Sequence, residues 1–156
     1  MDKATILILG GYGSAGRPVS RLLLQATPVK KVMIAGRNEA KAQQQSEALA
    51  AEFGADRVSP LVVDADDRIG LGQALAQVDL VIVCLAYRGN QAANVLQAVL
   101  DHGIHYIDLS PTAQKQTVLR PLAERLAAHD CIVLTEAGIF DESGPLSLFA
   151  GYGQAE

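Results

Sequence analysis

Three glycines near the start of the chain have the spacing of a dinucleotide-binding turn. They are Gly11, Gly13 and Gly16, in the pattern Gly-x-Gly-x-x-Gly, and they follow the apolar run Ile6–Leu9. In such a turn the first glycine makes a tight bend, the second lets the backbone approach a pyrophosphate, and the third lets a helix pack against the strand. Main-chain N–H groups at the start of that helix, where the helix dipole is positive, would face the phosphates. The pattern favours a site that holds a diphosphate without a charged side chain.

Two other interpretations of these glycines stay open. An ordinary turn between a strand and a helix also uses glycine, although the apolar patterns on either side are the context that the dinucleotide motif needs. A phosphate-binding P-loop shares the Gly-x-x-x-x-Gly spacing from Gly11 to Gly16. It requires Lys and then Ser or Thr at the next two positions, where this chain has Arg17–Pro18. Hydrolysis of a nucleoside triphosphate is therefore disfavoured.

The end of the second apolar run, Lys31–Gly36, indicates which nucleotide the site would take. In an NAD site an acidic side chain at this point hydrogen-bonds the ribose 2′-hydroxyl. The chain has Gly36 followed by Arg37, so the carboxylate that would repel a 2′-phosphate is missing and a guanidinium that can bind one is present. The sequence therefore predicts NADP rather than NAD or FAD. Arg37 could instead be a solvated residue at a strand end, and Lys41 either assists it or is simply exposed.

Residues at the ends of later strands are further candidates for this site. Asp64 and Ala65 follow the third strand, where they would approach the adenine edge. An Asp that caps the next helix explains Asp64 equally well. Cys84 ends the central strand, but its apolar neighbours raise the pKa of a thiol and make it inert, so core packing explains it better than catalysis.

Hydride transfer also needs a group that exchanges a proton with the substrate. The candidates near the expected crevice are Tyr87, His105, Tyr106, Asp108 and Ser110. Each has a structural explanation as well. His105 and Tyr106 alternate with Ile104 and Ile107 in a strand, so at least one of them could be a core residue. Ser110 can cap a helix, and Tyr87 stands in an ordinary loop. The Tyr-x-x-x-Lys pair of short-chain dehydrogenases is missing after both Tyr87 and Tyr106. The sequence therefore assigns no catalytic residue.

Six apolar strand patterns alternate with helical patterns along the chain. The strands are expected at Ile6–Leu9, Lys31–Gly36, Val58–Val63, Val78–Ala86, Ile104–Leu109 and Cys131–Leu134. This alternation implies right-handed crossovers, so we predict an α/β fold with three layers, a doubly wound and mostly parallel sheet in the Rossmann-like order 3-2-1-4-5-6. The ligand crevice would lie at the carboxyl ends of strands 1 and 4, where the order reverses. Pro121 is expected to break the last helix into two pieces.

Composition limits the partners of the chain. Its 156 residues suffice for one domain with its own core, and a net charge of −4 gives no general attraction to nucleic acid or acidic membranes. Cys84 and Cys131 form no Cys-x-x-Cys pair, which indicates reduced thiols rather than a disulfide framework or a zinc site. No apolar run reaches membrane-spanning length. We expect a cytoplasmic protein that binds a small molecule, with no metal and with its oligomeric state open.

An ordered set of segments resembles a known family. The segments are GGYGSAGRPVSRLL, MIAGRNEAKA, VVDADD, DLVIVCLA, HYIDLS and LTEAGI. Together they are similar to the NADP-binding domain of the saccharopine dehydrogenase-like oxidoreductases. The resemblance covers about residues Ile6 to Ile139, nearly the whole chain, and is far more specific than the glycines alone.

This resemblance implies NADP(H) as the cofactor, with contacts from four loops. The residues that would line the pyrophosphate are Gly11, Gly13, Ser14, Ala15 and Gly16, and Tyr12 of the same turn is also expected to bind the cofactor. Arg37 with Asn38 would hold the 2′-phosphate, and Asp64 with Ala65 would face adenine. Cys84, Leu85 and Ala86 would pass beneath the ribose and nicotinamide, and the HYIDLS segment would edge the nicotinamide pocket.

The chain departs from the family pattern after the sixth strand. Members of the family continue with an Ala-Gly-x-x-Pro-Gly turn into a second domain that closes over substrate, whereas this chain has AGIFDESGP and soon ends. We therefore expect a dinucleotide-binding domain at residues 1–139, an irregular tail at 140–156 and no substrate domain. The chain would be a truncated product, an excised domain or a free-standing module.

Two functions are compatible with this organisation. The first is the NADP(H)-binding domain of an oxidoreductase that transfers hydride, with a small amino-acid-like substrate bound through a missing or separate domain. Little or no turnover is then expected from this chain alone, because the substrate half is absent. The alternative is a non-catalytic NADP(H)-binding sensor or regulatory module.

Overall fold

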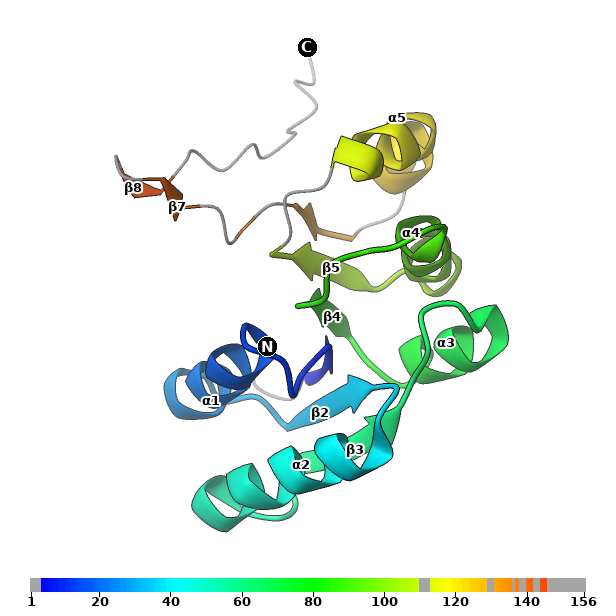
Figure 1. The fold of residues 1–156 in the computed structure, drawn as a ribbon. Helices are drawn as coiled ribbons and strands as arrows, with labels where there is room; N and C mark the ends of the chain where they lie inside the picture. The colour runs from blue at the N-terminus through cyan, green and yellow to red at the C-terminus, as the bar shows by residue number, and fades with distance from the viewer. Residues whose placement is uncertain are drawn as a thin grey trace.

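The computed structural model describes residues 4–109, 113–128, 131–135, 137, 140–141 and 144–145 (Figure 1). The helices and strands are β1 (Thr5–Leu9), α1 (Gly16–Ala26), β2 (Lys31–Gly36), α2 (Glu39–Phe53), β3 (Val58–Val62), α3 (Arg68–Leu75), β4 (Leu80–Val83), α4 (Gln91–His102), β5 (His105–Asp108), α5 (Ala113–Ala128), β6 (Val133–Leu134), β7 (Phe140–Asp141) and β8 (Gly144–Pro145). Strands alternate with helices as far as β6.

Strands β1 to β6 form one sheet in the order β3-β2-β1-β4-β5-β6, and each neighbouring pair is parallel. Ile8 of β1 lies in register with Ile34 of β2 on one side and with Ile82 of β4 on the other. The predicted α/β fold and its strand order are confirmed. Because the chain leaves β3 at one edge and crosses to β4 beyond β1, the carboxyl ends of β1 and β4 flank the point where the order reverses.

Both faces of the sheet are covered, and the alternation of side chains along β1 explains how. Ile6 and Ile8 pack into a core cluster with residues of α1 and α2, whereas Leu7 and Leu9 pack into a second cluster with residues of α3 and α4. Figure 1 shows these helices on opposite faces of the sheet. All four side chains are at most 1% exposed, and burying each stabilises the fold by about 1.5–3 kcal/mol. A continuous apolar strand is therefore what this position requires.

The central strand β4 is shorter than its apolar run predicts. It covers only Leu80–Val83, because Val78 still belongs to the turn after α3, where its N–H donates to the carbonyl of Leu75. Residues 84–86 leave the ladder and continue as a loop at the carboxyl end of the sheet. The centre of the run is a buried strand as predicted, but residues 84–86 form a loop that lines a cavity at the carboxyl end of the sheet.

The prediction that Pro121 breaks the last helix is wrong. Helix α5 runs from Ala113 to Ala128 with Pro121 inside it. Proline removes one helical N–H donor at this point, but Val118, Leu119 and Leu122 of the same helix pack against the larger core cluster. Packing along this face stabilises one continuous helix, so that tertiary contacts override the local preference. Ser110 and Pro111, the predicted start of the helix, lie outside the described residues.

A short antiparallel pair lies within the segment predicted to be irregular. Strands β7 and β8 pair through Phe140 with Pro145 and Asp141 with Gly144. Most of the segment 138–156 lies outside the described residues, so the predicted boundary of the domain stays a prediction.

Candidate functional site

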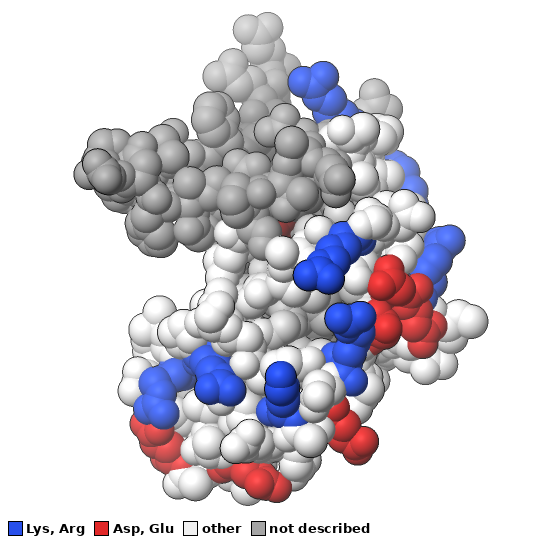
Figure 2. Space-filling model, viewed as in Figure 1, with Lys and Arg blue, Asp and Glu red and all other residues white. Residues whose placement is uncertain are grey.

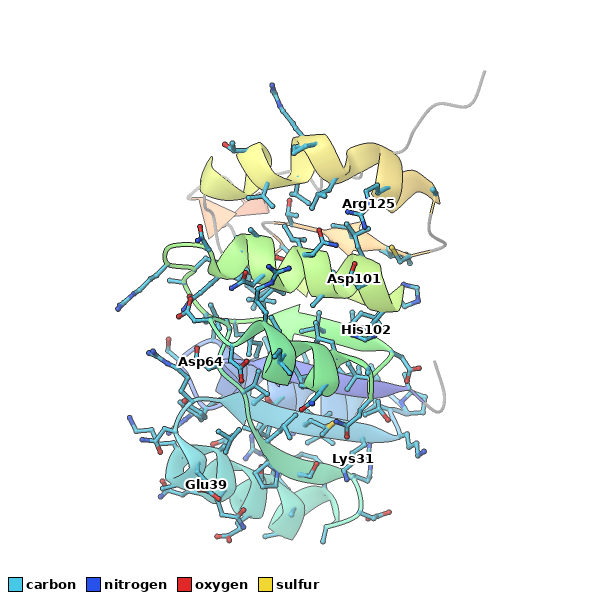
Figure 3. The ribbon with its side chains drawn as sticks, turned by 90° about the vertical axis from the view of Figure 1, so that its right-hand side faces the viewer. Lys31, Glu39, Asp64, Asp101, His102 and Arg125 are labelled. Atoms are coloured by element: carbon cyan, nitrogen blue, oxygen red, sulfur yellow. The ribbon has the colours of Figure 1, made fainter. Side chains whose placement is uncertain are left out.

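A cavity of about 450 Å³ lies at the carboxyl ends of β1 to β4, and we call it the switch-point cleft. Its lining residues come from the four loops that follow these strands: Leu9, Gly10, Tyr12, Gly13, Ser14, Gly36, Arg37, Val63, Asp64, Ala65, Asp66, Cys84, Leu85, Ala86, Arg88 and Gln91. Figure 3 shows Asp64, which follows β3, and Lys31, where β2 begins, at opposite ends of the parallel strands. Open parallel sheets bind ligands at this edge.

The glycine turn brings the backbone of Gly10 and Gly13 to the cleft, together with Tyr12 and Ser14. Gly10 has a φ of 85°, and the N–H groups of Gly10 and Gly11 both donate to the carbonyl of Ala35, at 2.8 and 3.1 Å. The tight bend therefore lies at Gly10, not at Gly11 as the motif predicts. Gly11 is instead buried, where an added Cβ would lie 3.0 Å from Cγ2 of Ile34.

Gly16 allows α1 to start directly against this turn. A Cβ on Gly16 would collide with the backbone of Gly10 and Gly11. Ala15, which precedes the helix, has no side chain that accepts from the first helical N–H groups. The N–H of Arg17 already donates to the carbonyl of Gly13 at 3.1 Å and Pro18 has no N–H, so the amino end of α1 offers a phosphate its positive dipole more than these N–H groups.

The end of β2 has no acidic side chain and carries an exposed cation. Gly36 is buried, Arg37 lines the cleft, and Asn38 caps α2 by accepting the N–H of Lys41 at 2.9 Å. Figure 2 views this side of the molecule and shows Lys and Arg side chains gathered around its hollowed middle. A guanidinium at this position would attract a phosphate on the 2′-oxygen of a ribose, and nothing at residue 36 would repel it.

Two loops on the far side of the cleft are tied together by Gln91. Its amide nitrogen donates to Oδ2 of Asp66 at 2.8 Å, and its amide oxygen accepts the N–H of Arg88 at 3.0 Å. Gln91 is only 8% exposed, whereas Asp66 and Arg88 are exposed, so this strap between the loops after β3 and β4 is partly buried. The two walls are thus held at a fixed separation.

The helix cap after β3 is not Asp64. Asp67 caps α3 by accepting the N–H groups of Ile69 and Gly70, both at 3.1 Å. Asp64 instead accepts the N–H of Asp66 at 3.0 Å and lines the cleft. The carboxylate is therefore held at the cavity, beside the buried Ala65.

Three of the proposed proton donors form one buried chain of hydrogen bonds. The hydroxyls of Tyr87 and Tyr106 lie 2.8 Å apart, and Tyr106 donates to Oδ2 of Asp108 at 2.7 Å. Since the proton of Tyr106 goes to Asp108, Tyr87 must donate to Tyr106. Burial raises the pKa of both tyrosines well above the ordinary value of 10.0, so both hydroxyls stay protonated. These three hydrogen-bonded side chains therefore tie the loop after β4 to β5, and they are poor proton donors.

The other two proposed donors are not brought to this chain. His105 begins β5, at the amino end of the strand, and its Nδ1 accepts the N–H of Ile132 at 3.0 Å. That contact places His105 at the opposite edge of the sheet from the switch-point cleft. Ser110 lies outside the described residues.

Cys84 lines the cleft but is a poor nucleophile. Burial raises the pKa of its thiol from 9.0 to about 12, so it stays protonated at neutral pH. The prediction of an inert thiol agrees with this environment.

Several residues of the cleft were not singled out by the sequence. Gly10 lies one position before the motif, and Asp66, Arg88 and Gln91 follow the predicted contacts by one to five residues. The rule that ligands bind beyond the carboxyl ends of strands pointed to these loops. Only the fold shows which side chains turn toward the cavity. Conversely, Gly11, Ala15, Gly16 and Asn38 support the cleft without lining it.

A larger cavity of about 640 Å³ lies between α3 and α4, and we call it the α3–α4 groove. Three carboxylates, from Asp66, Asp67 and Asp101, are among its lining residues. Figure 3 shows Asp101 and His102 at the end of α4 that lies away from Asp64. Among the described residues that line the groove, Arg68 is the one arginine or lysine, whereas the switch-point cleft has Arg37 and Arg88 against Asp64 and Asp66, so the smaller cleft fits a diphosphate better.

The family model for the saccharopine dehydrogenase NADP binding domain matches residues 6–137. The chain belongs to this family. Its cofactor is NADP(H), in agreement with Gly36 and Arg37 at the end of β2. The predicted family and cofactor are confirmed.

Other proteins are similar to this chain over part of their length. Saccharopine dehydrogenase (L-Glu forming) of Saccharomyces cerevisiae, solved without ligand, is 26% identical, with a TM-score of 0.67 over 85% of this chain and 27% of that one. UDP-N-acetylglucosamine 4,6-dehydratase (inverting) of Campylobacter jejuni is 28% identical over 66% of this chain and 34% of its own. Polyketide synthase GfsA of Streptomyces halstedii is 30% identical over 97% of this chain and 2% of its own. The chain spans about a third or less of each relative.

No helix in the described part of the chain is both long and apolar enough to cross a membrane. Within that part, histidine, cysteine and acidic side chains also form no group of three that could hold a metal ion.

Proposed function

We propose that this domain holds NADP(H) across the switch-point cleft for hydride transfer in an oxidoreductase whose substrate binds on another domain. The observation that carries the proposal is the end of β2, where a buried glycine and an exposed arginine line a cavity at the carboxyl ends of β1 to β4. This pair distinguishes a phosphorylated from an unphosphorylated adenosine ribose.

Each loop of the cleft has a role in this proposal. The turn Gly11–Gly16 receives the pyrophosphate, and Arg37 with Asn38 receives the 2′-phosphate. Asp64 and Ala65 face adenine. Residues 84–86, which leave β4 at the centre of the sheet, support the ribose and nicotinamide.

The nicotinamide supplies the hydride chemistry when the cofactor is bound, and this chain supplies position and shielding. The buried hydrogen-bond chain of Tyr87, Tyr106 and Asp108 stiffens the loop after β4. The raised pKa of each tyrosine argues against proton transfer to a substrate from either one. The acid or base of the reaction would then come with the substrate domain, and a small amino-acid-like substrate fits the family.

Nucleotide titration by calorimetry tests the proposal. We expect NADPH to bind more tightly than NADH. Arg37→Ala should weaken NADPH selectively by about 1.5–3 kcal/mol, the scale of a hydrogen bond to a charged group. Arg120→Ala removes an exposed arginine of α5 that does not line the cleft, and should bind both nucleotides as the wild type does. An equal loss for both nucleotides in Arg37→Ala would remove Arg37 from the 2′-phosphate.

A turnover assay separates the two functional classes. NADPH oxidation with amino-acid and keto-acid pairs should be negligible for this chain alone. Rapid oxidation that depends on substrate would show that the chain carries its own substrate site, contrary to the proposal.

A further inference from the structure

Tyr12 fills the space that a side chain at residue 36 would need. A Cβ placed on Gly36 would lie 2.5 Å from Cε1, 2.6 Å from the hydroxyl oxygen and 2.7 Å from Cζ of Tyr12. Side chains do not approach one another that closely, so the phenol ring lies directly over the backbone of Gly36. A side chain at residue 36 would therefore displace the ring of Tyr12, so Gly36 lets Tyr12 lie in this place as well as removing an acid.

Tyr12 is held in this place from two directions. Its hydroxyl oxygen accepts the N–H of Asn38 at 3.0 Å, and its carbonyl accepts Nε of Arg17 at 2.9 Å. Its side chain also packs against the core cluster beneath α1 and α2. The ring thus bridges the glycine turn to the start of α2.

The hydroxyl of Tyr12 can donate a hydrogen bond to a ligand in the cleft. In the contact with Asn38 the phenol oxygen is the acceptor, because a backbone N–H can only donate. Tyr12 also lines the switch-point cleft together with Arg37. Tyr12 and Arg37 therefore border the same cavity, in which an anionic group would bind.

We propose that Tyr12 is the residue that sets the preference for a 2′-phosphorylated dinucleotide, acting together with Gly36. Its ring excludes the acidic side chain that an NAD site needs, and its hydroxyl donates to the 2′-phosphate beside Arg37. This inference rests on the proposed function and assigns the choice of nucleotide to a residue of the glycine turn. Tyr12 and an acid at position 36 are then mutually exclusive.

Three variants titrated with NADPH and NADH test this inference, with thermal unfolding measured on each. Tyr12→Phe keeps the ring and removes the donor, so NADPH should weaken about 10-fold or more while NADH is unchanged. Gly36→Asp alone should lower the unfolding midpoint and weaken NADPH without a gain for NADH, because the ring blocks the carboxylate. The double variant Tyr12→Ala/Gly36→Asp should recover the midpoint lost by Gly36→Asp and bind NADH at least about 10-fold more tightly than Gly36→Asp does.

Two results would overturn the role of Tyr12 while leaving the proposed function intact. One is a Gly36→Asp variant that prefers NADH at an unchanged unfolding midpoint. The other is a Tyr12→Phe variant that loses NADPH and NADH affinity equally. A wild-type chain that binds neither nucleotide would instead overturn the proposed function itself.

Discussion

The two halves of the sheet build their sides of the cleft in opposite ways. The half formed by β1, β2 and β3 uses glycine, which lets backbone pack closely at Gly16 and lets the ring of Tyr12 lie over Gly36. The half formed by β4, β5 and β6 uses buried polar side chains, in the chain Tyr87–Tyr106–Asp108. The first half can accept a charged ligand through main-chain donors. In the second half, Tyr87, Tyr106 and Asp108 hydrogen-bond one another. Substitutions should therefore destabilise the two halves for different reasons: overpacking in the first half and unpaired buried polar groups in the second.

The largest effect is expected from Gly16→Ala in the first half. Its Cβ would meet the backbone of Gly10 and Gly11, which cannot rotate away as a side chain can. We expect a loss of about 3 kcal/mol or more in the free energy of unfolding, at the upper end of the range for overpacking. Urea denaturation measures it. A variant within 0.5 kcal/mol of wild type, on the order of an ordinary surface change, would show that the turn is not packed as described.

A smaller effect is expected from Tyr106→Phe in the second half. The change removes the donor to Asp108 and the acceptor of Tyr87, at a site where Tyr106 and Asp108 are 0% exposed. We expect a loss of about 1–3 kcal/mol, the cost of unpaired buried polar groups. Tyr87→Phe removes only the outer donor and should cost less. Equal losses for both variants in urea denaturation would argue against Tyr106 as the middle member that bonds both Tyr87 and Asp108.

The burial of Cys84, Tyr87 and Tyr106 makes the stability of the protein depend on pH. The pKa of the Cys84 thiol rises from 9.0 to about 12 on burial, and the pKa values of Tyr87 and Tyr106 rise above 10.0 for the same reason. These groups ionise first in the unfolded chain, so the folded state loses stability as pH rises above about 9, by up to about 1.4 kcal/mol per pH unit for each group.

Alkaline denaturation curves check this expectation. The wild type should keep its full contribution from these groups below pH 9, and Tyr106→Phe should lose stability less steeply above pH 10 than the wild type does. Parallel slopes for the two proteins would contradict a buried, protonated Tyr106.

The smallest effect, and one of opposite sign, is expected from Gly72→Ala. Gly72 lies within α3, and an added Cβ would meet only Nε2 of His102, at an ordinary 3.6 Å. Alanine should stabilise by about 0.5–1 kcal/mol, because glycine loses more backbone freedom on folding. It serves as the matched control for Gly16→Ala. A comparable loss for both glycines would show that intolerance is general and does not mark the turn.

The first half of the cleft was largely predictable because its chemistry is local. The glycine spacing, the missing acid at Gly36 and the cation at Arg37 stand next to one another in the sequence, and strand order follows from alternation. Local pattern could not place the bend at Gly10, because that position depends on hydrogen bonds to Ala35 of a neighbouring strand.

The second half was not predictable at the level of contacts. Tyr106 and Asp108 were singled out, but their link to Tyr87 depends on how the loop after β4 folds back over β5, where Val83 lies in register with Asp108. The contact of Tyr12 with Gly36 is likewise a property of two loops brought together by the sheet. Pro121 shows the converse, since packing overrode a correct local rule.

Amide chemical shifts of the ¹⁵N-labelled chain, followed while NADPH is added, test the central claim most directly. The account predicts saturable shifts at Gly13, Ser14 and Ala15 together with Arg37, and little change at Ile69 and Asp101 of the α3–α4 groove. Saturable shifts centred on that groove, with the glycine turn unmoved, would contradict it.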